Sequence, residues 1–187
     1  MTPENEATLA VIDALETLGI PYMLVGSLSS NAYGIPRSTH DADFVVECAV
    51  EFLPRIAAHV GPAYRLDPQM TFETATLTRR HVMNVIGIPF KIEFFHLSDD
   101  PHDQERFKRR RRVKLQDREV NLPTAEDVIV TKLRWVSMLN RTKDKDDVQA
   151  VLAVQGDKID WPYVYGWCDQ HDTRALLDEI RSSIPPL

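Results

Sequence analysis

Two aspartates, two positions apart, are the residues of this sequence best suited to do chemistry. Asp41 and Asp43 lie at the head of an apolar run over residues 44–46, which is typical of a buried β-strand. Positions i and i+2 of a strand point to one face, where two carboxylates repel each other and are costly to bury. Mg²⁺ is the simplest compensation, because it binds carboxylate oxygens and bridges phosphates. The pair therefore indicates nucleotidyl transfer; the alternative is a capping or turn pair at a strand entrance.

A glycine-serine pair precedes the aspartates. Gly26 and Ser27 end the apolar run 22–25 and begin a segment with the pattern of a turn that leads into a short helix. Backbone N–H groups at such a helix start can hold phosphate oxygens, and the serine hydroxyl adds a further donor. A Gly-Ser pair alone is usually only a turn, so its significance depends on the aspartates that follow.

Glu93 is the candidate for a third carboxylate, which a site for two metal ions usually needs. Alternation along the strand predicts that Ile92 and Phe94 face the core, while Lys91 and Glu93 lie on the opposite face. If that face also carries the aspartates, three carboxylates converge from neighbouring strands. The alternative is that Lys91 and Glu93 are the solvated side of a half-exposed strand.

Lys132 lies on an otherwise apolar helical stripe that includes Val128 and Val136, so its ammonium should point inward. An inward lysine needs an anion, either a nucleotide phosphate or a buried carboxylate; otherwise it extends to solvent from the edge of the stripe. Asp147 also falls on an inward face, where an ion pair with Lys132 or Arg141 would satisfy it. Arg37 precedes the aspartates and could reach a phosphate, although a lone loop arginine is more often a surface charge.

A strongly basic run stands out in a chain of net charge −6. Residues 106–114 carry seven basic side chains, with Arg109, Arg110, Arg111 and Arg112 consecutive. We expect the run to contact a polyanion, such as the phosphates of tRNA or another RNA. The alternatives are a solvated strand or turn balanced by nearby acidic residues, and a site for an acidic protein partner.

The remaining pattern predicts an α/β (α+β) fold in one compact unit. A sheet core over residues 1–122 is followed by a helical segment over residues 123–187. Helices are expected at 6–18, 26–33, 51–59, 124–139, 145–154 and once within 162–182, and strands at 22–25, 43–46, 81–86, 90–96 and within 113–122.

Composition excludes several classes of protein. At 187 residues the chain is about one domain, and the net charge of −6 argues against nucleic-acid binding over the whole surface. No apolar run approaches the ~20 residues of a membrane span. Cys48 and Cys168 fit no metal or disulfide spacing, and residues 1–6 lack the features of a signal peptide. We therefore expect a cytoplasmic protein that acts away from membranes.

Taken together, these residues resemble the nucleotidyltransferase superfamily. The resemblance is carried by Gly26-Ser27, thirteen intervening residues, Asp41-Ala42-Asp43, and Glu93 on a later strand. Residues 26–43 are most similar to the small bacterial branch that includes AbiEii-like toxins of toxin–antitoxin and phage-abortive systems. The likeness extends through Lys132 and residues 141–144, and so covers most of residues 20–152.

This resemblance implies a nucleotidyltransferase-like mixed sheet flanked by helices, with a C-terminal helical segment. Asp41 and Asp43 would ligate Mg²⁺, with Glu93 as third ligand and as the group that helps to activate an attacking hydroxyl. Gly26 and Ser27 would hold the triphosphate of the incoming nucleotide. The hydroxyl would attack the α-phosphorus in line, with loss of pyrophosphate.

The resemblance also bears on Lys132 and on partners. AbiEii-like toxins carry a lysine on the corresponding helix, which favours a functional role for Lys132, with Arg37 as a further nucleotide contact. The acceptor would be an RNA end or a protein hydroxyl, and an antitoxin protein would be a partner. One alternative is a transferase acting on a small molecule, as in antibiotic-modifying members. Another is a non-catalytic member that binds a nucleotide or a partner protein.

Overall fold

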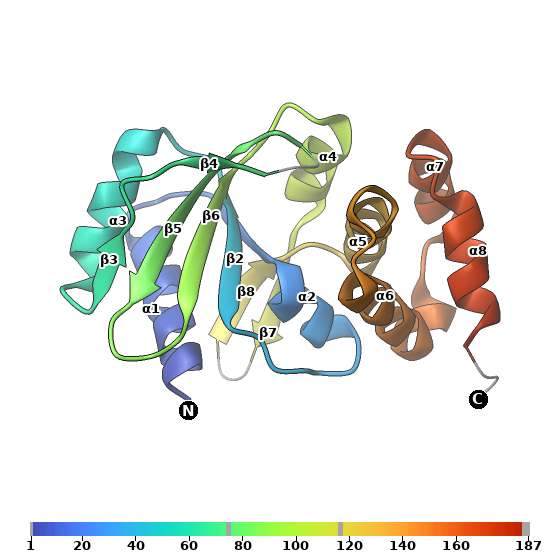
Figure 1. Ribbon diagram of the computed structural model, residues 1–187, viewed down its shortest axis with the longest axis horizontal. Coiled ribbons are helices and arrows are strands. Elements are labelled where there is room, and N and C mark those ends of the chain that lie inside the picture. The colour runs from blue at the N-terminus through green and yellow to red at the C-terminus, as the bar shows by residue number, and fades with distance from the viewer. Residues whose placement is uncertain (1, 74–75, 116–117, 185–187) are drawn as a thin grey trace.

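A computed structural model describes residues 2–73, 76–115 and 118–184. A six-stranded sheet occupies one half of the molecule, with strand order β1-β2-β6-β5-β3 and β4 paired to β5, and helices fill the other half (Figure 1). The strands are β1 (Tyr22–Val25), β2 (Asp41–Val46), β3 (Tyr64–Leu66), β4 (Thr71–Phe72), β5 (Arg79–Val85) and β6 (Lys91–His96).

The sheet is mixed, because only β2 and β6 among the described pairs run parallel. In their register Asp43 lies beside Glu93, and Asp41 beside Lys91. On the other side of β2, the antiparallel strand β1 places Val25 beside Asp43. The first two strands thus bring the Gly-Ser turn and the aspartates together at one sheet position.

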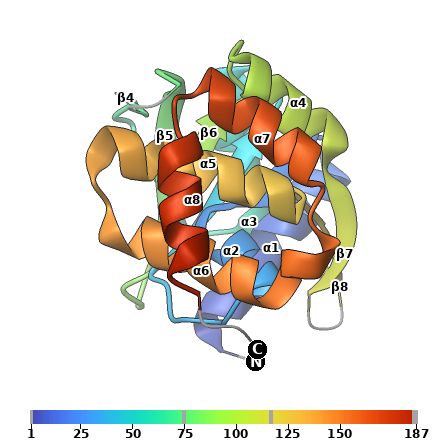
Figure 2. The same ribbon diagram turned by 90° about the vertical axis from the view of Figure 1, so that its right-hand side faces the viewer.

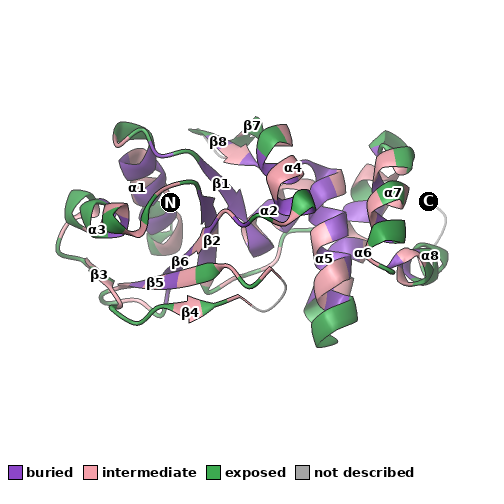
Figure 3. Cartoon of the chain, turned by 90° about the horizontal axis from the view of Figure 1, so that it is seen from above, coloured by how far each residue is buried: buried purple, intermediate pink, exposed green. Residues whose placement is uncertain are grey.

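One face of the sheet forms the main hydrophobic core. Phe44 and Phe94 stack there with ring centroids 5.9 Å apart, and helices α1 (Pro3–Thr17) and α3 (Leu53–Val60) cover them, with the short helix η1 (Val50–Phe52) before α3. Figure 3 shows buried residues on α1, β1 and β2, and a second set among the helices of the other half. Alternation then leaves polar side chains on the opposite face, as in Lys91 and Glu93.

The second half is a set of packed helices with its own hydrophobic cluster. Helices α5 (Ala125–Leu139) and α6 (Thr142–Gln155) pack on α2 (Gly26–Tyr33), and α7 (Trp161–Gln170) and α8 (Arg174–Ser182) cover their outer side (Figure 2). The short helix η2 (Gly156–Lys158) connects α6 to α7. Tyr33 donates to the Pro123 carbonyl over 2.8 Å and its own carbonyl accepts from Gln155 Nε2 over 3.0 Å, which joins the two halves.

The expected elements are largely confirmed, including the strand at 22–25, the helix at 26–33 and the hairpin of β5 and β6. The segment 113–122 is also a hairpin, of β7 (Arg111–Leu115) and β8 (Arg118–Leu122). The expectation of one helix within 162–182 is wrong, since α7 and α8 are separated by a turn at His171 and Asp172.

Helix α4 (Pro101–Arg109) was not expected, because the alternative for the basic run was a solvated strand or turn. Asp100 caps this helix: its Oδ1 accepts from the backbone N–H groups of His102 and Asp103, and proline occupies the first turn. The basic run therefore divides between the end of α4 and the start of β7. Among the described helices, none combines the length and apolarity needed to cross a bilayer.

Candidate active site

Three carboxylates lie on one face of the sheet, at the centre of the candidate site. Asp41 and Asp43 share a face of β2, and the register puts Glu93 on the adjacent strand directly beside Asp43. Neighbouring strands are about 4.8 Å apart. The structure thus brings together the three residues that the sequence suggested as metal ligands, while their role as ligands stays a prediction.

Gly26 is where the chain must approach Asp43 most closely. Its φ is +64°, and a Cβ built on it would lie 2.0 Å from Asp43 Oδ2. Only glycine leaves room for the carboxylate and adopts this backbone conformation without strain. The glycine therefore places the N-terminus of helix α2, with its backbone N–H groups, against the Asp43 carboxylate.

The pKa of Asp43 is raised to about 7. The largest cause is burial of the carboxyl group, which removes water from it even though the residue as a whole is half-buried. Repulsion by the carboxylates of Asp41 and Glu93 raises the pKa further. Lys132 and Lys91 oppose the shift without cancelling it. Uncompensated negative charge at this position is what a bound cation would relieve.

Within the part of the chain that the structure describes, Glu93 is paired with cationic side chains, unlike Asp41 and Asp43. It is buried, its Oε1 is paired with Lys91 Nζ, and its Oε2 lies 3.3 Å from Arg80 Nη1. Across the described parts of the chain, no three His, Cys, Asp or Glu side chains are placed to hold a metal ion together. Glu93 would therefore have to leave its cations before acting as a third ligand.

The carboxylates of Asp41 and Asp43 are suited to bind Mg²⁺ without a third protein carboxylate. This ion keeps several waters and is usually held by one or two carboxylates together with substrate phosphates. Thr39 donates to Asp41 Oδ1 over 2.7 Å, which orients that carboxylate. The oxygen donors and the raised pKa of Asp43 both agree with a magnesium site of two carboxylates.

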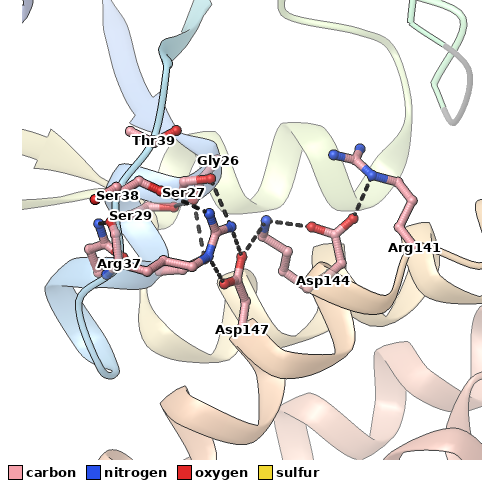
Figure 4. Close-up of polar contacts among 12 residues, drawn as sticks. Gly26, Ser27, Ser29, Arg37, Ser38, Thr39, Arg141, Asp144 and Asp147 are labelled. Atoms are coloured by element: carbon pink, nitrogen blue, oxygen red, sulfur yellow. Dashed lines mark hydrogen bonds and ion pairs between the residues drawn. The ribbon is translucent and has the colours of Figure 1, made fainter. Parts of the chain in front are cut away.

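Ser27 and Arg37 are joined to each other and to the helical half. Ser27 is buried, and its Oγ accepts from Arg37 Nη2 over 2.9 Å. Arg37 also makes a bidentate contact with Asp147, with distances of 2.7 and 2.9 Å (Figure 4). Because the serine hydroxyl accepts this bond, its proton remains for another acceptor, such as a phosphate oxygen.

Lys132 points inward, as its helical spacing predicted. Its Nζ is buried between Asp144 Oδ1 at 2.7 Å and Asp147 Oδ2 at 2.9 Å, and Asp144 lies 3.0 Å from Arg141 Nε. The anions that meet the lysine are thus carboxylates of α6. A hydrogen bond from Arg37 to Ser27 continues into a chain of ion pairs that ends at Arg141 (Figure 4).

Half of the arginine run at residues 109–112 is paired within the molecule. Arg109 lies 3.4 Å from the buried Asp127, and Arg112 lies 3.4 Å from Glu16. Arg111 is exposed at the start of β7. The run is therefore less available to an external polyanion than its composition suggested.

Three contacts of the site were missed at the sequence level. Thr39 binds Asp41, and Lys91 and Arg80 neutralise Glu93. Alternation had placed Lys91 on the face of Glu93, which is a detectable signal for that pair. Arg80 meets Glu93 only through the β5–β6 register, and no local pattern indicates it.

Comparison with known proteins supports the fold. No family model matches the chain, and no curated protein sequence matches it. The structure is similar to the antibiotic-resistance factor ANT(2'')-Ia in complex with adenylyl-2''-tobramycin, at 11% identity and a TM-score of 0.64 over 93% of this chain and 99% of that one. It also resembles the lincosamide antibiotic adenylyltransferase LnuA with lincomycin bound, at 11% identity and a TM-score of 0.54 over 80% and 96%.

A third similar structure is an antigenic nucleotidyltransferase-like protein from Paracoccidioides brasiliensis. It is 13% identical, with a TM-score of 0.52 over 96% of this chain and 93% of that one. At these identities the likeness establishes the fold alone. The expectation of a mixed sheet flanked by helices is confirmed, and the AbiEii-like subtype stays a prediction.

Proposed function

We propose that this chain, which has the nucleotidyltransferase fold, transfers a nucleoside monophosphate from a nucleoside triphosphate to an acceptor hydroxyl in a magnesium-dependent reaction. One observation supports this most strongly. The uncompensated pair Asp41 and Asp43 lies against the glycine that opens helix α2. A cation site and a phosphate-binding helix start thereby share one position.

Each residue then has a defined task. Asp41 and Asp43 would hold Mg²⁺, which neutralises charge on the triphosphate when bound. Gly26 offers its backbone N–H and Ser27 its hydroxyl proton to the phosphate oxygens. Arg37 holds the helical half against this site through its ion pair with Asp147, and Lys132 holds that carboxylate in place from α5.

The transfer itself exchanges one phosphorus–oxygen bond for another. The acceptor oxygen bonds to the α-phosphorus, the bond from that phosphorus to the bridging oxygen breaks, and pyrophosphate leaves with the electron pair. The hydroxyl proton passes to a carboxylate, for which Glu93 is the proposed acceptor. Glu93 would first loosen its contact with Lys91 or Arg80. Positioning and charge neutralisation would supply most of the rate.

Two classes of acceptor are proposed. An RNA or protein hydroxyl, with the chain acting as the toxin of a toxin–antitoxin pair, follows from the sequence resemblance. A small-molecule hydroxyl is favoured by the internal pairing of Arg109 and Arg112, which leaves less of the basic run for RNA. The names of two structural neighbours also include antibiotics, tobramycin and lincomycin.

A label-transfer assay tests the proposal. The protein, Mg²⁺ and each nucleoside triphosphate labelled at the α-phosphate would be incubated with total tRNA, with cell extract, and with tobramycin or lincomycin. The double variant Asp41→Asn/Asp43→Asn should lose transfer, whereas Asp146→Asn, an exposed carboxylate of α6, should retain it. Absence of both transfer and magnesium-dependent nucleotide binding in the folded wild type would overturn the proposal in favour of a partner-binding module.

A further inference from the structure

A row of polar side chains crosses the sheet from Asp41 outward. The register pairs Asp41 with Lys91, Lys91 with Asn84, and Asn84 with Arg65, on four successive strands. Residues paired in this way project to the same face. The row therefore continues the face of the candidate magnesium site over β6, β5 and β3.

Burial shows that this face is open to solvent. On β5, Met83 is buried against the core, whereas Asn84 is only half-buried. Arg65 is exposed between Tyr64 and Leu66, which pack on the core from the other face. In Figure 1, α1 lies behind β5 and β6 and no described helix lies in front of them.

The outer part of the row lines a groove of about 530 Å³. Arg65, Asn84 and Lys91 contribute polar groups to it, and His40 from the loop before Asp41 lies on its wall. Apolar residues at the β5–β6 turn, such as Ile88, complete the lining. The groove thus starts beside the loop that precedes the aspartates and extends away from them.

The donors of this groove suit an anion. A guanidinium and an ammonium donate charge-assisted hydrogen bonds, and the Asn84 amide adds a neutral donor. Among the described residues, no carboxylate lies within ion-pair distance of Arg65, so its charge is available. The Lys91 ammonium is shared with Glu93.

We propose that this groove binds a phosphate group of the acceptor, whose hydroxyl then lies at the aspartates. This inference rests on the proposed nucleotidyl transfer and names the acceptor class: a hydroxyl compound that carries a phosphate. With strands about 4.8 Å apart, Asn84 lies two strands, or about 10 Å, from Asp41. Arg65 lies one strand further away, at about 14 Å. These are separations between backbones; the reach of the donor side chains and the contact distances at each end shorten the gap to one that a sugar unit can span, in a sugar phosphate or at the end of an RNA strand.

Calorimetry on the full chain can test the groove without turnover. The protein would be saturated with Mg²⁺ and a non-hydrolysable triphosphate analogue, then titrated with ribose 5-phosphate, with ribose, or with a short oligoribonucleotide. Arg65→Ala and Asn84→Ala should each weaken binding of a phosphate-bearing probe about tenfold. Arg55→Ala, which removes an exposed arginine of α3, is the matched control and should leave binding unchanged.

The outcomes separate this inference from the proposed function. Binding of the triphosphate analogue should need Asp41 and Asp43 and be unaffected by Arg65→Ala. Tight binding of ribose 5-phosphate would identify a small acceptor, and binding of the oligoribonucleotide alone would identify an RNA end. Equal binding of ribose and ribose 5-phosphate, absence of binding by both phosphate-bearing probes, or equal losses in Arg65→Ala and Arg55→Ala would overturn the groove while leaving nucleotidyl transfer intact.

Discussion

Two groups of buried or half-buried carboxylates lie on either side of helix α2, and their charges are compensated very differently. On α6, Asp147 binds Arg37 and Lys132; these cations hold its pKa below the ordinary value although burial opposes the shift. On β2, the pKa of Asp43 is raised to about 7 by burial and by the neighbouring carboxylates. Compensated carboxylates build structure, whereas an uncompensated pair beside the N-terminus of a helix indicates a place for a ligand.

The largest expected effect comes from breaking the compensated group. Lys132→Met should lower the free energy of unfolding by about 3–5 kcal/mol, because it leaves Asp144 and Asp147 buried with less positive charge. Urea denaturation would measure it.

Lys145→Met is the matched control for that variant. It removes an exposed ion pair with Glu179, whose side chain is 64% exposed, and should cost less than about 1 kcal/mol. Equal losses in the two variants would show that the buried network contributes no more stability than an exposed ion pair.

The sequence could not distinguish these two groups of aspartates. Asp41 and Asp43 follow a strand pattern and Asp147 a helical one, and both patterns leave the partners open. Asp147 meets Arg37 from 110 positions away, a contact that only the packing of α6 on α2 creates. Charge compensation is a long-range property, so local spacing revealed the candidates and tertiary structure separated them.

The same reasoning explains which elements were predictable. The strand, glycine turn and helix over 22–33 are fixed by local signals, because Gly26 and Gly34 bound an eight-residue helix. Helix α4 carries an equally local signal in the cap Asp100 and in Pro101, but the dense positive charge over 106–112 is unfavourable to a helix in isolation. Where helix α4 ends and strand β7 begins within the basic run depends on which arginines pair with carboxylates in the folded chain.

The close contact between Gly26 and Asp43 allows the uncompensated pair on β2 to be tested by a single substitution. Gly26→Ala places a Cβ 2.0 Å from Asp43 Oδ2, so the carboxylate must rotate away. We expect nucleotide-dependent magnesium binding to be lost and stability to fall by about 1–3 kcal/mol more than in Gly61→Ala.

Gly61 is a suitable control because its φ is also positive, at +94°, and nothing lies within 4 Å of a Cβ built there. Both variants carry backbone strain, and only Gly26→Ala crowds the site. Thermal unfolding with and without Mg²⁺ and nucleotide would separate the two effects. Retention of magnesium binding in a folded Gly26→Ala would contradict the assignment of Asp43 as a ligand.

The two groups should also respond to pH with opposite signs. Between about pH 4 and 7 the folded state keeps a proton on Asp43 that the unfolded state has lost, so this residue makes stability fall as the pH rises. Asp43→Asn should therefore stabilise the metal-free protein at pH 8 by about 0.5–2 kcal/mol.

Asp147 provides the reverse case. Its pKa is lowered, so its stabilising effect is present above the unfolded pKa and is lost as the pH falls. Asp147→Asn should destabilise the protein at pH 8, and added Mg²⁺ should stabilise the wild type but not Asp43→Asn. Destabilisation of the metal-free protein at pH 8 by Asp43→Asn would mean that the pair on β2 is compensated after all.

The smallest expected change in stability concerns the basic run, where exposed side chains lie next to one that is paired with a buried carboxylate. Lys108, Arg111 and Lys114 are exposed, whereas Arg109 pairs with Asp127 and lies 3.8 Å from the Tyr163 ring. Replacing the three exposed residues with Gln should change stability by less than about 0.5 kcal/mol. Arg109→Gln, by comparison, should cost about 1–2 kcal/mol in urea denaturation, because it removes a buried carboxylate's partner.

The exposed residues also offer a test of the RNA expectation. If the run binds a polyanion, the triple variant should weaken oligoribonucleotide binding and reduce its salt dependence, by about 0.7 in the log–log slope for each phosphate that the variant no longer neutralises. Arg109→Gln should leave that slope unchanged. Unchanged affinity and slope in the triple variant would remove the run from the binding surface, and any RNA binding would then have to come from the groove at Arg65.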